Sequence, residues 1–146
     1  MTNGIHIKTV EEIKIMAEGG KKLSKVKESL RRKVAPGVNA HEIEVLATEL
    51  ILKEGGKPSF KMVPGYKWST CININQGIVH GIPKKEVVFK KGDIVSVDVG
   101  FYYKGFHTDT SFSLGLGVDE EIINFLKAGE KALGEAIDKA RIGNKI

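Results

Sequence analysis

The chain has 146 residues, of which 41% are hydrophobic and 28% charged, a composition that indicates one folded domain rather than a disordered segment. The formal net charge of +5 is spread along the sequence, so we ascribe it to a solvated surface and expect no specific nucleic-acid partner. A transient contact with the ribosome stays open as an alternative use of this charge. The single cysteine, Cys71, excludes an internal disulfide and a four-thiolate zinc site, and we interpret it as a small buried hydrophobic residue.

Two further observations concern where the chain works. No apolar run approaches the roughly 20 residues needed to cross a bilayer. The first residues also lack the apolar stretch that is typical of a signal peptide. We therefore expect a cytoplasmic protein with no membrane partner.

The first two predicted elements are helices, each opened by a capping box. One capping box starts at Thr9 and begins a helix over about 9–35, in which apolar residues recur at helical spacing until a Pro-Gly pair ends it. The second capping box starts at Asn39 and begins a helix over about 39–55, which carries an apolar stripe.

The pattern then changes to strands and turns over about 70–116, and a last helix is predicted over about 119–140. The expected strands start at Cys71, Ile78, Ile94 and Phe106. The element order is helix, helix, several strands, helix. It predicts an α+β domain with an antiparallel sheet and helices packed on one face.

Two aspartates carry the sharpest chemical signal. If Lys104-Gly105 forms a two-residue hairpin turn, Gly100 faces Asp109 and Asp98 faces Ser111. Asp98 and Asp109 then become diagonal neighbours on one sheet face, with their Cβ atoms at or below roughly 7–8 Å apart. Carboxylates at strand ends are commonly solvent-exposed, but two held this close repel each other unless a proton or a cation lies between them.

A pair of divalent cations suits two such carboxylates, because a two-metal site holds its ions roughly 3.5–4 Å apart with bridging carboxylates. Oxygen ligands favour Mn²⁺, Mg²⁺ or Fe²⁺, while Co²⁺ and Zn²⁺ accept mixed nitrogen and oxygen sites. His80 is the second candidate residue, since a histidine near a metal-bound peptide can donate a hydrogen bond to developing charge or shuttle a proton. A histidine with a purely structural role is the simpler interpretation of His80 taken alone.

Five short motifs follow one another along the chain. They are Gly65-Tyr66, Cys71-Ile-Asn-Ile-Asn75, Val79-His-Gly-Ile-Pro83, Lys91-Gly-Asp-Ile-Val-Ser-Val-Asp98-Val-Gly100 and Tyr103-Lys-Gly-Phe-His-Thr-Asp109-Thr110. In order and spacing they are similar to the motifs of type I methionine aminopeptidases, and the resemblance covers nearly the whole chain.

The resemblance implies the N-terminal portion of a pita-bread fold and a dinuclear metal aminopeptidase. Such an enzyme removes the N-terminal methionine from nascent polypeptides by hydrolysis through a metal-bridging water. It implies that Asp98 and Asp109 are ligands of two divalent ions (Co, Mn, Fe or Zn), with Asp109 bridging them. It further implies that His80 contacts the substrate and assists the reaction, and that Tyr66 and Cys71 line the pocket for the methionine side chain.

The chain departs from the family pattern in two respects. Phe60 and Val63 fall where the bacterial pattern often has a cysteine and a tyrosine, which changes the shape expected for the pocket. The family also uses a further histidine and two glutamates as ligands, and this sequence has no histidine after His107. We therefore expect 1–146 to be a partial catalytic domain that lacks the C-terminal half, with little activity alone.

Three alternatives remain at this point. The first is a proline-specific peptidase of the same fold, which the context of Tyr66, Cys71 and His80 argues against. The second is a non-catalytic binding module, which has no need of the close carboxylates Asp98 and Asp109. The third is a half-domain that completes its site by self-association.

Overall fold

A computed structural model describes residues 6–145 of the chain. The helices are α1 (Val10–Lys33), α2 (Ala40–Lys53) and α3 (Glu120–Lys139), with a short 3-10 helix, η1 (Phe60–Met62). The strands are β1 (Lys57–Pro58), β2 (Thr70–Ile74), β3 (Ile94–Tyr103) and β4 (Phe106–Gly115). None of the helices within the described residues is long and apolar enough to cross a membrane.

Side-chain caps fix where the three long helices start. Thr9 and Asn39 each accept a hydrogen bond from the backbone N–H three residues on, and the glutamate there reaches back to the cap, so both form a full capping box. Asp119 caps α3 by accepting from the backbone N–H of Ile122 at 3.0 Å. Each cap thereby satisfies one of the backbone N–H groups that have no partner within the helix.

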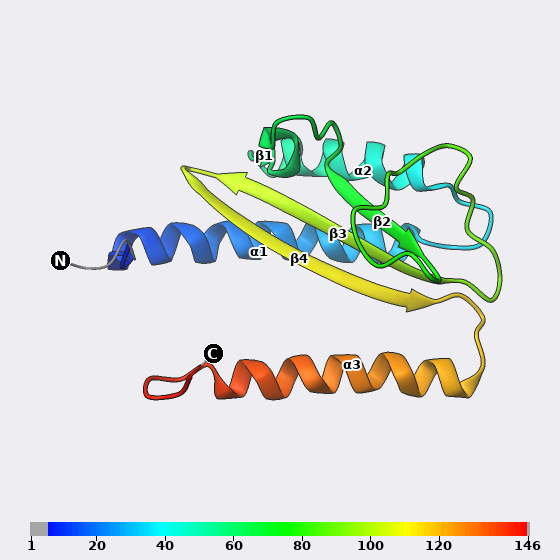
Figure 1. Ribbon diagram of the computed structural model, residues 1–146. Coiled ribbons are helices and arrows are strands. Elements are labelled where there is room, and N and C mark those ends of the chain that lie inside the picture. The colour runs from blue at the N-terminus through cyan, green and yellow to red at the C-terminus, as the bar shows by residue number, and fades with distance from the viewer. Residues whose placement is uncertain (1–5, 146) are drawn as a thin grey trace.

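The sheet is antiparallel and built around β3, the long central strand (Figure 1). β4 pairs with one edge of β3, while β2 and the two-residue β1 share the other edge. A tight turn at Lys104 and Gly105, with φ values of 46° and 94°, joins β3 to β4. The resulting pairs Gly100–Asp109 and Asp98–Ser111 confirm the register predicted from a two-residue hairpin.

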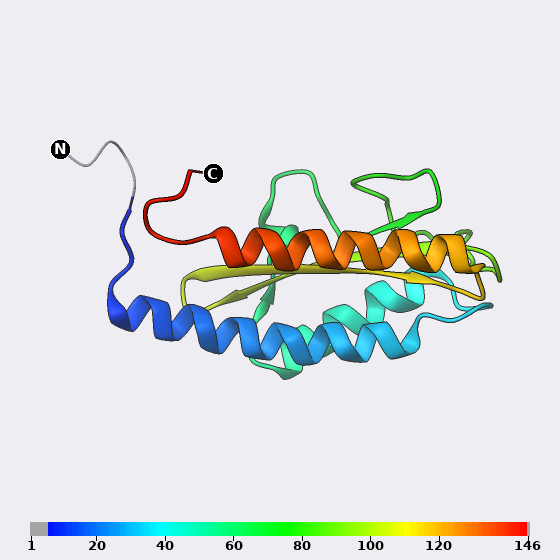
Figure 2. The ribbon, with the colours of Figure 1, turned by 90° about the horizontal axis from the view of Figure 1, so that it is seen from below.

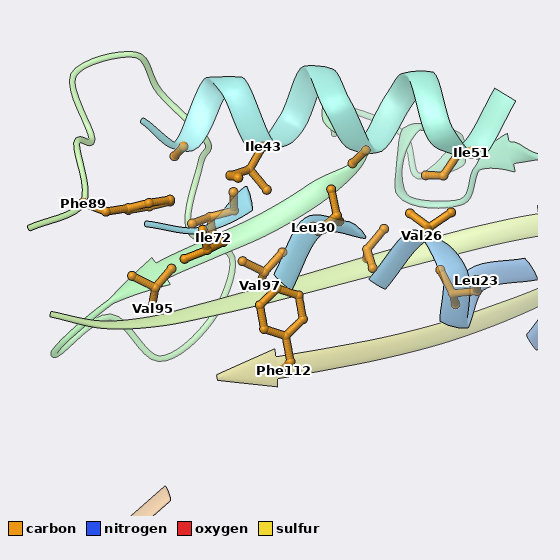
Figure 3. Close-up of a cluster of buried hydrophobic side chains, with 14 of the residues drawn as sticks. Leu23, Val26, Leu30, Ile43, Ile51, Ile72, Phe89, Val95, Val97 and Phe112 are labelled. Carbon is orange, nitrogen blue, oxygen red and sulfur yellow. The ribbon is translucent and has the colours of Figure 1, made fainter. Parts of the chain in front are cut away.

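The two faces of the sheet differ in character because successive side chains of a strand alternate between them. Alternate residues of β3 point into a hydrophobic core that α1 and α2 cover (Figure 3). The fully buried members from β3 are Val95, Val97, Val99 and Phe101. The intervening residues, among them Asp98, face the other side, where the loops that flank β2 rise above the sheet (Figure 2). The structure is thus the α+β arrangement predicted, with α1 and α2 on one face.

Helix α3 lies differently from the first two helices. It runs alongside β4, outside the α1–α2 layer (Figures 1 and 2). None of its residues is buried, and the side chains of Phe125, Leu133 and Ile137 are 68%, 63% and 64% exposed. The core of the described residues therefore depends on α1, α2 and the sheet.

One predicted strand is wrong. Ile78 and Val79 lie in a loop over 75–93 and are 86% and 67% exposed. Asn75 has a left-handed φ of 54°, and the N–H of Gly77 bonds back to the carbonyl of Ile74, so the chain turns away from the sheet directly after β2. A run of only two apolar residues is a weak strand signal, and here the hydrogen-bonded turn before it determines the path of the chain.

Candidate active site

A hollow of about 680 Å³ opens on the sheet face opposite the core. It contains all five residues that the sequence predicts for the site: Tyr66, Cys71, His80, Asp98 and Asp109. Its other lining residues are Phe60, Val63, Pro64, Gly65 and Ile82. Side chains separated by more than forty positions in the sequence thus share one cavity with an apolar and an acidic part.

The acidic part is the pair Asp98 and Asp109, which project from the neighbouring strands β3 and β4. Burial, together with the adjacent carboxylate of Asp109, raises the pKa of Asp98 to about 6. The same causes act against placing two negative charges here without a counter-ion. A divalent cation would remove the repulsion, so the donor set fits oxygen coordination of a metal.

Two aspartates alone would not complete a metal site. Within residues 6–145, no group of three or more His, Cys, Asp or Glu side chains lies close enough to hold one ion. His107 shares the sheet face of Asp109, and its Nδ1 is 2.6 Å from the hydroxyl of Ser59. The histidine ring is therefore occupied by a hydroxyl partner beside the acidic pair.

The backbone around His80 is held in an unusual conformation. His80 has a φ of 55°, which non-glycine residues seldom adopt. The next residue, Gly81, accepts a hydrogen bond from the N–H of Ile72 at 2.9 Å, and a Cβ at position 81 would collide with the Ile72 carbonyl. The loop therefore lies directly on β2, and this contact places His80 at the rim of the hollow. Backbone strain of this kind tends to occur at functional sites.

Tyr66 and Cys71 form one wall of the hollow. The Tyr66 hydroxyl donates to the Thr70 carbonyl at 2.8 Å and lies 3.0 Å from the Cys71 sulfur. Burial, aided by the neighbouring thiol, raises the pKa of Tyr66, and burial likewise raises the pKa of Cys71. Both groups are therefore neutral at physiological pH, and Cys71 is 6% exposed, which confirms the expectation of a buried thiol.

Phe60 forms a second wall, which meets the first at Tyr66, and the sequence predicted only that its position departs from the family pattern. It lies against β3 at Gly100, where an added Cβ would come within 2.6 Å of the phenyl ring. Its ring also meets that of Tyr66 edge to face, with centroids 6.3 Å apart. The absence of a side chain at Gly100 thus determines how deep the phenyl ring sits.

Sequence reasoning missed one buried charge beside the site. Glu44 of α2 is 5% exposed and accepts hydrogen bonds from Ser69 and Thr70, just before Cys71. The available signal was weak, because Glu44 stands next to Ile43 at the border of an apolar stripe, where solvated carboxylates are common.

An antiparallel sheet that carries paired carboxylates beside an apolar hollow fits the class of metallopeptidases. The chain belongs to metallopeptidase family M24, which it matches over residues 14–146. Its fold is the N-terminal portion of the pita-bread fold of that family, as predicted. The family implies divalent metal cofactors.

Among individual relatives, the chain is 36% identical to a methionine aminopeptidase of Clostridium perfringens over 143 residues, 97% of this chain and 57% of that protein. It is 33% identical to methionine aminopeptidase 1 of Bacillus subtilis, covering 95% of this chain and 56% of that protein. The crystal structure of a methionine aminopeptidase from Thermotoga maritima superposes with a TM-score of 0.89 at 40% identity, covering 94% of this chain and 55% of that chain. The chain thus spans little more than half the length of the relatives it matches.

Proposed function

We propose that this chain supplies the substrate pocket and two metal ligands of an enzyme that removes the N-terminal methionine from nascent polypeptides. The observation that carries the proposal is that Asp98 and Asp109 share one hollow with the apolar lining of Phe60, Tyr66 and Cys71. A peptidase of this type needs a place for charge beside a place for an unbranched apolar side chain. The similarity to methionine aminopeptidases supports this choice of substrate.

Asp98 and Asp109 would both serve as ligands of two divalent ions, of Co, Mn, Fe or Zn. When bound, the ions supply Lewis acidity and a water molecule of lowered pKa. The desolvation that raises the pKa of Asp98 in the metal-free chain would then favour metal over solvent at the same oxygens. The remaining ligands would have to come from residues other than this pair.

The other side chains bind and orient the substrate. Tyr66, Cys71 and Phe60 would surround the methionine side chain with neutral, mostly apolar groups and keep water from it. His80, at the rim, would donate a hydrogen bond to the peptide carbonyl as negative charge develops there. Its left-handed backbone fixes the direction from which it approaches.

The substrate implied is the exposed N-terminus of a new polypeptide, and we propose that the protein acts in the cytoplasm. A transient contact with the ribosome belongs to the same proposal, supported only by the net charge of +5. Lysines and arginines spread over the surface favour approach to RNA without requiring a sequence-specific interface.

Metal binding tests the acidic part of the proposal. Titration of the purified chain with Mn²⁺, followed by electron paramagnetic resonance, is expected to show weak binding that Asp109→Asn abolishes. Asp138→Asn, in an exposed turn of α3, is the matched control and should bind as the parent does. Equal binding by the parent and Asp109→Asn would instead favour a non-catalytic binding module.

Peptide cleavage tests the substrate. Protein made from the whole reading frame of the source gene is expected to release methionine from Met-Ala-Ser and to leave Ala-Pro-Ser intact, while the 146-residue chain alone turns over slowly. The reverse preference would favour a proline-specific peptidase. Turnover by the chain alone that rises with the square of its concentration would indicate completion of the site by self-association.

A further inference from the structure

We propose that Glu44 is a positioning residue that holds both walls of the substrate pocket in place. This inference rests on the proposed function for the identity of the substrate, while the arrangement that it describes is a matter of contacts alone. Glu44 lies in α2, outside the hollow, and acts through the segments that line it.

The first wall is held through Ser69 and Thr70, at the start of β2. The N–H of Ser69 donates to both carboxylate oxygens of Glu44, at 2.8 and 2.9 Å. Thr70 donates its N–H and its hydroxyl to one of these oxygens, at 3.0 and 2.8 Å. Its carbonyl, in turn, accepts the hydroxyl of Tyr66 at 2.8 Å, and Cys71 is the next residue. Thr70 therefore links Glu44 directly to the Tyr66–Cys71 wall.

The second wall is held through Lys61, which follows Phe60 in η1. The Lys61 ammonium lies 3.4 Å from a carboxylate oxygen of Glu44 and donates to the Thr48 hydroxyl at 3.2 Å. The short η1 helix has no side-chain cap of its own. The ion pair with Glu44 is thus an anchor between α2 and the segment that carries the phenyl ring.

The groups that bind the Glu44 carboxylate indicate a role in the pocket rather than a general contribution to core stability. A buried carboxylate is costly unless it is fully hydrogen-bonded, and apolar residues would stabilise a core at least as well. Apart from Thr48 on its own helix, every group that binds Glu44 belongs to a segment bordering the hollow. The Glu44 carboxylate therefore connects α2 to the two segments that carry the walls of the pocket.

Glu44→Gln is the sharpest substitution because it keeps the shape of the side chain. Since Ser69 donates to both oxygens, either orientation of the glutamine places its amide N–H₂ against a backbone N–H. Glu49→Gln is the matched control, because Glu49 is an exposed glutamate on the same helix.

The chain offers two built-in reporters, its single cysteine in the wall and its single tryptophan, Trp68, next to Ser69. Glu44→Gln is expected to increase the alkylation rate of Cys71 on the order of tenfold and to shift Trp68 emission, while circular dichroism still shows a cooperative melt. Millimolar L-methionine should slow alkylation in the parent and in Glu49→Gln but not in Glu44→Gln. L-Lysine, as a control ligand, should protect none of them.

Each outcome decides one point. Unchanged Cys71 alkylation and equal methionine protection in parent and Glu44→Gln would overturn the proposal. Faster alkylation in Glu44→Gln without methionine protection in the parent would support the positioning role and refute the proposed substrate. If Glu44→Gln does not fold, Thr70→Val removes one hydroxyl donor and keeps the buried carboxylate. It should give the same changes at about threefold, and a parent-like result for Thr70→Val would overturn the proposal.

Discussion

Replacing Asp98 by asparagine is expected to stabilise the metal-free chain at neutral pH. The folded pKa of Asp98 is about 6, above its ordinary value of 3.8. The folded chain therefore binds more protons than the unfolded chain between these values, and the contribution of Asp98 to stability falls as pH rises through that window. Above it, the full penalty for a charged Asp98 remains.

The pKa difference sets the magnitude. A shift from 3.8 to about 6 corresponds to at most about 3 kcal/mol. Because Asp98 is only partly buried, solvent screening reduces the expected penalty to about 1–2 kcal/mol. Asp98→Asn removes the charge with little change of shape, so it should recover this amount above pH 7 and little or nothing near pH 4.

Urea unfolding in the presence of EDTA, followed by circular dichroism at pH 4 and pH 7.5, measures the difference. The quantity that matters is the stability of the variant minus that of the parent at each pH, since carboxylates remote from Asp98 contribute equally in both proteins. Asp138→Asn is the control and should change stability by the same small amount at both pH values. A loss of stability for Asp98→Asn at pH 7.5, or a gain of equal size at both pH values, would refute this account of the acidic pair.

Three further substitutions test other parts of the structure by thermal or urea unfolding. Gly81→Ala should destabilise by about 2–4 kcal/mol because its Cβ meets the β2 backbone, whereas Gly129→Ala, with open space around it on a helix, should be neutral or stabilising by up to about 1 kcal/mol. A parent-like Gly81→Ala would show that the loop can lift off the sheet at no cost. Gly100→Ala should displace Phe60 and destabilise the chain by at least about 1 kcal/mol. It should also weaken the protection that L-methionine gives Cys71 against alkylation. Unchanged protection would mean that the Phe60 ring does not shape the pocket. Thr9→Ala should remove the first cap and cost about 1 kcal/mol, and a change below about 0.3 kcal/mol would place the helix start elsewhere.

The acidic pair was predictable from sequence because its geometry is local. A two-residue turn fixes the register of a hairpin, and the period of two along a strand then decides which side chains share a face. Asp98 and Asp109 follow from those two rules alone. The helix starts at Thr9 and Asn39 are equally local, since a cap acts over three residues.

Other features depend on contacts between distant segments, which no local rule supplies. The hydrogen bonds of Glu44 reach 25 and 26 positions along the chain, and Phe60 meets a glycine forty positions away. The strand predicted at Ile78 failed for a different, local reason, because the hydrogen-bonded turn between Ile74 and Gly77 directs the chain away from the sheet. The places of Tyr66 and His80 in the site came from resemblance to a family, not from their local patterns.

The alternation along β3 has a consequence for folding fidelity. Val97 faces the core and Asp98 the hollow, so pairing β3 with β4 one residue out of step would exchange them. A shifted hairpin would drive a carboxylate into the hydrocarbon interior and expose valine to water, and such a state could not persist. A molecule of this chain whose β3 valines are packed in the core therefore presents Asp98 on the face of the hollow. The core packing that stabilises the native state thus also excludes the register that would remove Asp98 from the site. This selection requires neither a metal ion nor a peptide.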